Sequence, residues 1–272
     1  TCVNQDSAPP LCEDIDECLE DNGDCGDPTY WECVNLEAQP PSCEDIDECA
    51  AGDEICGDPA SWDCVNVAGG PPECVHDWGQ DWSELTDGVE LIELGGSIPS
   101  SLISYSPGAF PVLMSENRAS VAAARVGEGR IFHVGHESLI GGKLLGDDDA
   151  AQLIRNALSW LAQTESPTIG LLENLNAMKT FLDGEGLEYS EIGFGDLGAY
   201  DLVIITTGFE WSDGENTALQ EYMAHGGGVL SGGHAWYWSY YNANAAENHP
   251  GNKLLANVGF VISGATAPSG DY

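Results

Sequence analysis

Basic residues are nearly absent from this sequence, and the first of them is Arg118. The 272 residues include 7 Lys and Arg against 46 Asp and Glu, so the formal net charge at pH 7 is −39. A chain with this charge repels phosphate groups, which excludes nucleic acid and anionic membrane surfaces as partners. Two explanations of the acidity stay open: oxygen ligands for divalent cations, and solubility in salty water.

Cysteine is absent from residues 75–272, and long apolar runs are absent throughout. Because no apolar run reaches about 18 residues, insertion into a membrane is not expected. A cysteine nucleophile is excluded in the part without cysteine, and that part must fold by burying a core. The short first part needs covalent cross-links instead. The sequence therefore predicts two domains, residues 1–76 and 77–272.

The 10 cysteines of the first domain recur at an offset of 31 residues. The run Cys-Glu-Asp-Ile-Asp-Glu-Cys stands at residues 12–18 and again at residues 43–49. Self-similarity at a fixed period indicates small modules in tandem, the first of them partial. Zinc is a weaker explanation than disulfides, because the short Cys-x-x-Cys spacing of zinc sites is missing. Since disulfides persist in oxidising compartments, the expected location is secreted, extracellular or at the cell surface.

The Asp-Ile-Asp-Glu-Cys run and the Cys-x-Asn after it resemble the calcium-binding epidermal-growth-factor-like (EGF-like) module over residues 13–74. The modules depart from that family because each has four cysteines instead of six and lacks the usual glycine and aromatic residue before the fourth. The resemblance implies bound calcium, with ligands Asp14, the Ile15 carbonyl, Glu17 and Asn35, then Asp45, the Ile46 carbonyl, Glu48 and Asn66. A solvated acidic face is the alternative.

The same resemblance implies a disulfide pairing in each module. The first cysteine would join the third and the second would join the fourth, which gives Cys18–Cys33, Cys25–Cys43, Cys49–Cys64 and Cys56–Cys74. This pairing leaves Cys2 and Cys12 without partners.

The second domain shows alternating strand and helix patterns. Expected strands cover residues 89–94, 110–114, 121–126, 130–134, 169–172, 189–192, 202–206 and 229–231. Expected helices follow the acidic cap at residues 147–149 and cover residues 175–182 and 215–225. This alternation predicts an α/β three-layer domain with a largely parallel sheet.

Familiar catalytic motifs are missing from the second domain. Residues 193–198 match Gly-x-Gly-x-x-Gly, but a strand is expected directly after them, where a dinucleotide site needs a helix. Neither a Gly-x-Ser-x-Gly elbow nor a His-Glu-x-x-His helix is present. His133, His136 and Glu137 could bind a metal, but strand positions three apart point to opposite faces. The domain is therefore expected not to be an enzyme.

Three stretches carry a second resemblance: residues 127–137, residues 156–161, and residues 226–238 with 248–253. They look like the glutamine-amidotransferase-like domain that precedes the catalytic domain in TRP-channel-associated factors and enhancin-like mucin-cleaving metallopeptidases. The resemblance spans about residues 95–262 and implies a non-catalytic three-layer α/β domain.

Aromatic residues follow the glycine run at residues 226–233, at the expected carboxyl end of a strand, where open α/β sheets bind ligands. Such side chains stack on sugars or on partner proteins, or pack a loop onto the sheet. The candidate ligand-binding residues are His136, His234, Trp236, Tyr237 and Trp238.

Together these features predict a secreted, acidic, calcium-binding structural protein, namely a rod-like spacer, adhesin or fibre subunit. Its expected partners are other proteins or glycans at the cell surface, or further copies in a fibre. The alternative is the accessory, substrate-targeting region of a secreted enhancin-like metallopeptidase whose catalytic domain lies downstream.

Overall fold

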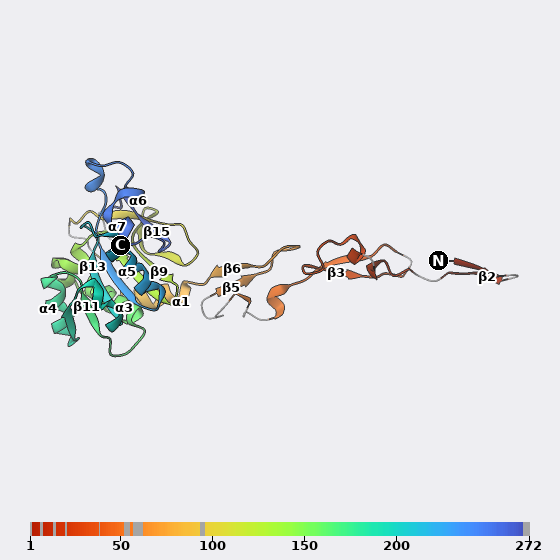
Figure 1. Ribbon diagram of the computed structural model, residues 1–272, viewed down its shortest axis with the longest axis horizontal. Helices are drawn as coiled ribbons and strands as arrows, with labels where there is room; N and C mark the ends of the chain where they lie inside the picture. The colour runs from red at the N-terminus through yellow and green to blue at the C-terminus, as the bar shows by residue number, and fades with distance from the viewer. Residues whose placement is uncertain are drawn as a thin grey trace. The chain divides into compact units, whose positions relative to one another are not determined.

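The computed structural model (Figure 1) describes residues 2–5, 8–12, 15–19, 21–37, 39–51, 55–56, 62–92 and 96–268. The chain divides into two compact units, Thr1–Asp77 and Trp78–Tyr272. Among the described residues, none of the helices combines the length and apolar composition needed to cross a membrane.

The first unit consists of antiparallel hairpins and short 3-10 turns. The paired strands are β1 (Cys2–Gln5) with β2 (Ala8–Cys12), β3 (Trp31–Val34) with β4 (Ser42–Asp45), and β5 (Trp62–Val65) with β6 (Glu73–His76). The turns are η1 (Glu17–Leu19), η2 (Asp21–Asp24) and η3 (Glu48–Ala51).

Among the described residues, four disulfides hold the β3–β4 and β5–β6 hairpins to the segments before them. They join Cys18 to Cys33, Cys25 to Cys43, Cys49 to Cys64 and Cys56 to Cys74, the pairs that the EGF-like resemblance implied. Cys2 lies opposite Cys12 in the register of β1 and β2, while the side chains of both lie outside the described part of the chain.

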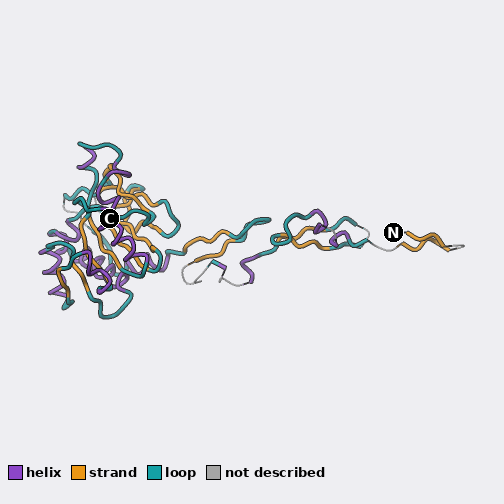
Figure 2. Tube along the Cα trace, viewed as in Figure 1, coloured by secondary structure: helices purple, strands orange, loops and turns teal. Residues whose placement is uncertain are grey.

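The second unit is built on a mixed sheet, drawn in orange in Figure 2, with the strand order β12-β11-β13-β14-β10-β9-β7-β15 and β8 also paired to β9. The strands are β7 (Ser100–Ser104), β8 (Ala109–Ser115), β9 (Arg118–Val126), β10 (Gly129–Val134), β11 (Ile169–Leu171), β12 (Tyr189–Glu191), β13 (Leu202–Thr206), β14 (Gly228–Gly232) and β15 (Phe260–Thr266). The five strands from β12 to β10 run parallel, as expected, and the others add an antiparallel extension.

Helices cover both faces of this sheet. The helices are α1 (Gly79–Thr86), α2 (Ser138–Gly141), α3 (Asp148–Ala162), α4 (Asn176–Glu185), α5 (Asp213–Ala224), α6 (Ala245–Asn248) and α7 (Pro250–Leu254). The 3-10 turns are η5 (Lys143–Gly146), η6 (Phe194–Ala199) and η7 (Trp238–Tyr240). The glycine fingerprint at residues 193–198 thus forms a 3-10 turn, not the start of an α-helix.

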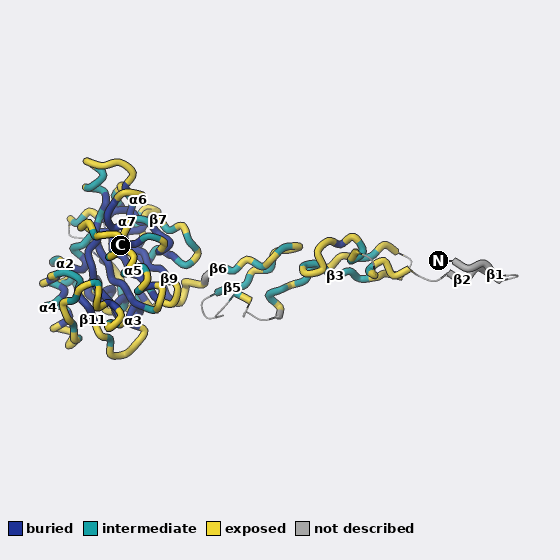
Figure 3. Tube along the Cα trace, in the orientation of Figure 1, coloured by how far each residue is buried: buried dark blue, intermediate teal, exposed yellow. Residues whose placement is uncertain are grey.

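Alternate residues of the central strands enter two separate cores. On β13, Leu202 and Ile204 pack with α3 and α4, whereas Val203 and Ile205 pack with α5 and the segment around α7. The central strands are accordingly buried on both sides, as the dark blue trace of Figure 3 shows. A period-2 strand with apolar residues on both faces requires this helix–sheet–helix layering.

One expected strand is not formed. Over residues 89–92 the chain is irregular, and residues 93–94 lie outside the described residues. The backbone N–H groups of Glu90 and Leu91 both donate to Oδ2 of Asp149, at 3.1 and 2.6 Å. The segment is therefore held by a side chain of α3 instead of a neighbouring strand.

Candidate functional site

Three parallel strands end together at one edge of the sheet. Val134 of β10 and Thr206 of β13 both pair with Gly232 of β14. The segments after these three residues border a cavity of about 420 Å³. Open α/β sheets place their ligands outside the carboxyl ends of their strands, so this cavity is the candidate site.

Aromatic side chains form the rim of the cavity. Phe209, Tyr237 and Tyr241 line it, and Tyr240 packs edge-on against Tyr237 with ring centroids 6.3 Å apart. These four side chains, here named the aromatic rim, are 60 %, 53 %, 75 % and 73 % exposed in the order Phe209, Tyr237, Tyr241, Tyr240. So much exposed aromatic surface in one place is typical of a contact surface for another molecule.

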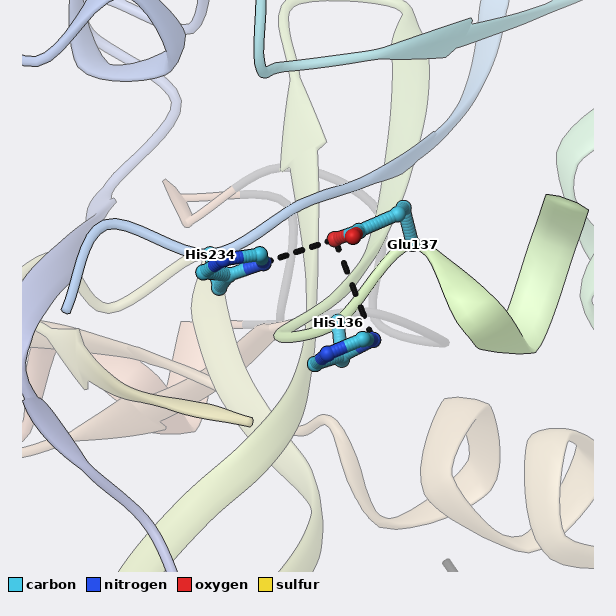
Figure 4. A group of neighbouring side chains, drawn as sticks. All are labelled: His136, Glu137 and His234. Atoms are coloured by element: carbon cyan, nitrogen blue, oxygen red, sulfur yellow. Dashed lines mark hydrogen bonds and ion pairs between the residues drawn. The ribbon is translucent and has the colours of Figure 1, made fainter. Parts of the chain in front are cut away.

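Three polar side chains lie together at this edge of the sheet (Figure 4), and two of them, Glu137 and His234, line the cavity. His136 and Glu137 follow β10, and His234 follows β14. The Nδ1–H of His234 donates to Oε2 of Glu137 at 2.7 Å, and Nδ1 of His136 lies 3.8 Å from the same oxygen. The imidazole rings of His136 and His234 stack with centroids 4.9 Å apart.

The electrostatics favour an ionised carboxylate at Glu137. Burial raises the pKa of Glu137, but the hydrogen bond from His234 and the nearby histidines outweigh it and lower that pKa to about 2. Burial lowers the pKa of His136, and burial together with the charge of His234 lowers the pKa of His249, which also lines the cavity, to about 4. The cavity is thus acidic and partly apolar.

His133 takes no part in the cavity, although the sequence offered it as a metal ligand. Its side chain is fully buried, with Nδ1 2.8 Å from Oγ of Ser231, and its Nε2 has no partner among the described residues. Burial lowers its pKa to about 3. His133 lies on β10, whereas His136 lies two residues past the end of that strand.

Of the candidate ligand-binding residues, the structure brings His136 and His234 together and stacks Trp236 on His234, with centroids 5.3 Å apart. Tyr237 and Trp238 line the cavity. Tyr241, which belongs to the aromatic residues after the glycine run, lines the cavity too, whereas the sequence missed Phe209 because it follows β13, far from that run. The position of Phe209 just past a parallel strand was the available signal.

The hydrogen bonds of His136, His234 and His249 connect these side chains to their surroundings. Among the described residues, the bonds of His136, His234 and His249 run to backbone N–H groups and to Glu137, and none joins a hydroxyl.

The second module joint gathers part of its expected calcium ligands. Nδ2 of Asn66 donates to Oδ2 of Asp45 at 2.7 Å, and both carboxylate oxygens of Glu48 are buried without a partner among the described residues. In the first module, Asp14 lies outside the described residues, and the Ile15 side chain is 57 % exposed. Calcium at either joint stays a prediction.

Comparison with known proteins places the second unit in context. A family model described as TRPM8, N-terminal domain (TCAF_N) matches residues 63–272. A TRPM8 channel-associated factor homolog of Danio rerio is 34 % identical over 201 residues, which cover 72 % of this chain and 21 % of that protein. TRPM8 channel-associated factor 2 of Homo sapiens is 32 % identical over 199 residues, covering 71 % of this chain and 20 % of that protein.

Solved structures share the fold. The IMPa metallopeptidase of Pseudomonas aeruginosa in complex with an O-glycopeptide has a TM-score of 0.53 and 15 % identity, and the match covers 70 % of this chain and 22 % of that one. The same peptidase in complex with T-antigen gives a TM-score of 0.52 at 15 % identity, with the same coverage of both chains. At this identity the similarity shows the fold alone.

These comparisons correct the function expected from the sequence. The relatives are named for association with a TRPM8 channel, so the predicted function as a structural protein, namely a rod-like spacer, adhesin or fibre subunit, is wrong. The IMPa similarity does not transfer a peptidase-targeting role either, because it rests on 15 % identity. The location of the chain stays a prediction.

Proposed function

The chain belongs to the TRPM8 channel-associated factor N-terminal domain family, and we propose that its globular unit binds a membrane channel of the TRPM8 kind through the aromatic rim. The chain spans about a fifth of the length of the relatives reported above. The proposal therefore concerns this domain and its contact with a protein partner.

The observation that carries the proposal is the exposure of the aromatic rim. Phe209, Tyr237, Tyr240 and Tyr241 are all more than half exposed, and all but Tyr240 line the cavity. Tyrosines are enriched among the residues that dominate binding energy at protein interfaces, where they bury large area with few rotatable bonds. Burying these rings against a partner would remove apolar surface from water.

The negative charge of the chain indicates what kind of surface it can bind. The chain carries a net charge of −39, and Glu137 lines the cavity. A binding surface with this potential attracts a basic surface and repels an acidic one. We therefore expect the contacted part of the channel to carry Lys or Arg side chains, some of them close to apolar residues that reach the rim.

Equilibrium binding of the full chain to purified TRPM8 channel in detergent micelles tests the proposal. The expected result is saturable binding that weakens as salt is added, because the charge attraction is screened while the aromatic contact remains. Micelles without channel are the control. Binding that is equal in the presence and absence of channel would contradict the proposal.

A further inference from the structure

Three side chains of metal-binding type lie together just past the ends of two neighbouring strands. β10 and β14 pair in parallel, with Val134 opposite Gly232 at their ends. Two residues past that pair, His136 and His234 face each other from the two strands, and Glu137 reaches between them (Figure 4). The register of the sheet therefore fixes the two histidines at the same level.

The donor atoms are close enough to share one ion. One ligand atom from each of His136, Glu137 and His234 lies within 4.8 Å of the others. Two imidazole nitrogens and one carboxylate oxygen suit zinc and other first-row transition metals, whereas calcium and magnesium prefer oxygen ligands alone. The three side chains are part-buried, so they are shielded while still reachable from solvent.

We infer that His136, Glu137 and His234 form a binding site for a divalent first-row transition metal, with zinc as the expected ion. Glu137 and His234 line the cavity, so the position opposite the three protein ligands opens into it. Three protein ligands with one open position is the arrangement of a zinc site that accepts water or a further ligand.

Metal binding requires one ring to turn. The two imidazole planes lie at 13° to each other with centroids 4.9 Å apart, and a metal ligated by both must lie near both ring planes. His234, whose side chain is 22 % exposed, borders the cavity, and turning its ring about the Cβ–Cγ bond would break its stacks on His136 and Trp236. Its hydrogen bond to Glu137 and the 3.2 Å bond from the Ser138 N–H to His136 would give way to bonds with the ion.

The full chain, stripped with a chelator, is titrated with Zn²⁺ by calorimetry, with excess Ca²⁺ present to occupy the carboxylates of the modules. The expected result is one zinc ion per chain at this site, and visible absorption of a low-symmetry complex when Co²⁺ replaces zinc. His136→Ala and His234→Ala should each weaken zinc binding by more than the roughly 10–100-fold typical of losing an outer-shell partner. Glu137→Gln, which keeps the size of the side chain, should weaken it in the same direction.

His225→Ala is the matched control, because His225 precedes β14 and lies at the opposite end of that strand, which is about 13 Å long at the usual rise per residue. Its zinc affinity should equal that of the wild type. Circular dichroism shows whether each variant is folded. If a histidine variant is not folded, the zinc affinity of Glu137→Gln decides whether the site exists. The proposed site is contradicted if the wild type binds no zinc, or if the folded variants bind zinc as tightly as His225→Ala does.

Discussion

Asp81 and Arg125 form a two-pronged ion pair that fastens α1 to β9. Nε of Arg125 donates to Oδ2 of Asp81 at 2.8 Å, and Nη2 donates to Oδ1 at 2.7 Å. Asp81 is only 2 % exposed, and Nε1 of Trp160 on α3 also donates to Oδ1, at 2.9 Å. One carboxylate thus connects α1, the sheet and α3.

Loss of Arg125 should destabilise the second unit strongly. Arg125→Met leaves the Asp81 carboxylate buried without its charged partner, and breaking a buried pair in this way costs about 3–5 kcal/mol of unfolding free energy. Arg155→Met is the control, since Arg155 pairs at 2.9 Å with Glu185 while its own side chain is 41 % exposed. That surface pair should contribute less than about 1 kcal/mol. Equal losses in urea unfolding of the two variants would contradict this assignment.

Acid should destabilise the second unit through His133. Burial lowers the pKa of His133 to about 3, whereas an unfolded histidine titrates at 6.5. Between these values the unfolded chain binds the extra proton, so stability is present above about pH 6.5 and falls as the pH drops. The loss is about 1.4 kcal/mol for each pH unit well below 6.5.

Urea unfolding at pH 7 and pH 5 measures this effect. Replacing the imidazole in His133→Leu removes the titrating group, so the variant should lose less stability between the two pH values than the wild type does. An identical pH dependence in both proteins would show that His133 is not the group responsible.

Glycine is required at residue 129, where the backbone contacts the end of α5 and the segment after it. A Cβ atom there would lie 2.2 Å from the carbonyl oxygen of Met223 and 2.4 Å from that of Gly227. Gly129→Ala should therefore lower the unfolding free energy by about 1–3 kcal/mol or more, as overpacking does. Gly184 of α4 meets nothing within 4 Å, so Gly184→Ala should stabilise the protein by about 0.5–1 kcal/mol. Thermal unfolding of both variants checks the opposite signs.

Reduction should loosen the first unit and leave the second intact. All four described disulfides lie between Cys18 and Cys74, and residues 75–272 contain no cysteine. Removing a disulfide from a small domain costs about 2–5 kcal/mol. Limited proteolysis with and without dithiothreitol should therefore show new cuts before Asp77 only. Faster cutting of the second unit under reduction would contradict its independence from the disulfides.

The sequence predicted best where local pattern and tertiary packing agree. β13 matches its expected bounds, Leu202–Thr206, because every residue of it is apolar or β-branched and buried on one face or the other. The cap of α3 was also readable, since the Asp147 side chain accepts the Ala150 N–H at 2.9 Å. The largely parallel half of the sheet followed from the alternation of such segments.

The antiparallel extension could not be predicted in the same way. β7 is rich in serine, which is a weak strand signal, and it pairs with β15, which lies far along the chain. The local sequence of neither strand indicates this pairing. The residues of the site likewise differ in whether the local sequence pointed to them. His136 and His234 were candidates from their own motifs, whereas Phe209 joins the cavity only because β13 lies beside β14.

The measurement that tests the account most directly is the affinity of the full chain for TRPM8 channel in micelles when rim tyrosines are changed. Tyr237→Ala and Tyr241→Ala should each weaken binding by about 2 kcal/mol, or roughly 30-fold, as interface hot spots do. Tyr237→Phe keeps the ring and should bind nearly as the wild type does. Met114→Ala, at a 50 % exposed residue on β8 outside the rim, should have no effect. Unchanged affinity in both alanine variants at Tyr237 and Tyr241 would contradict binding through the aromatic rim.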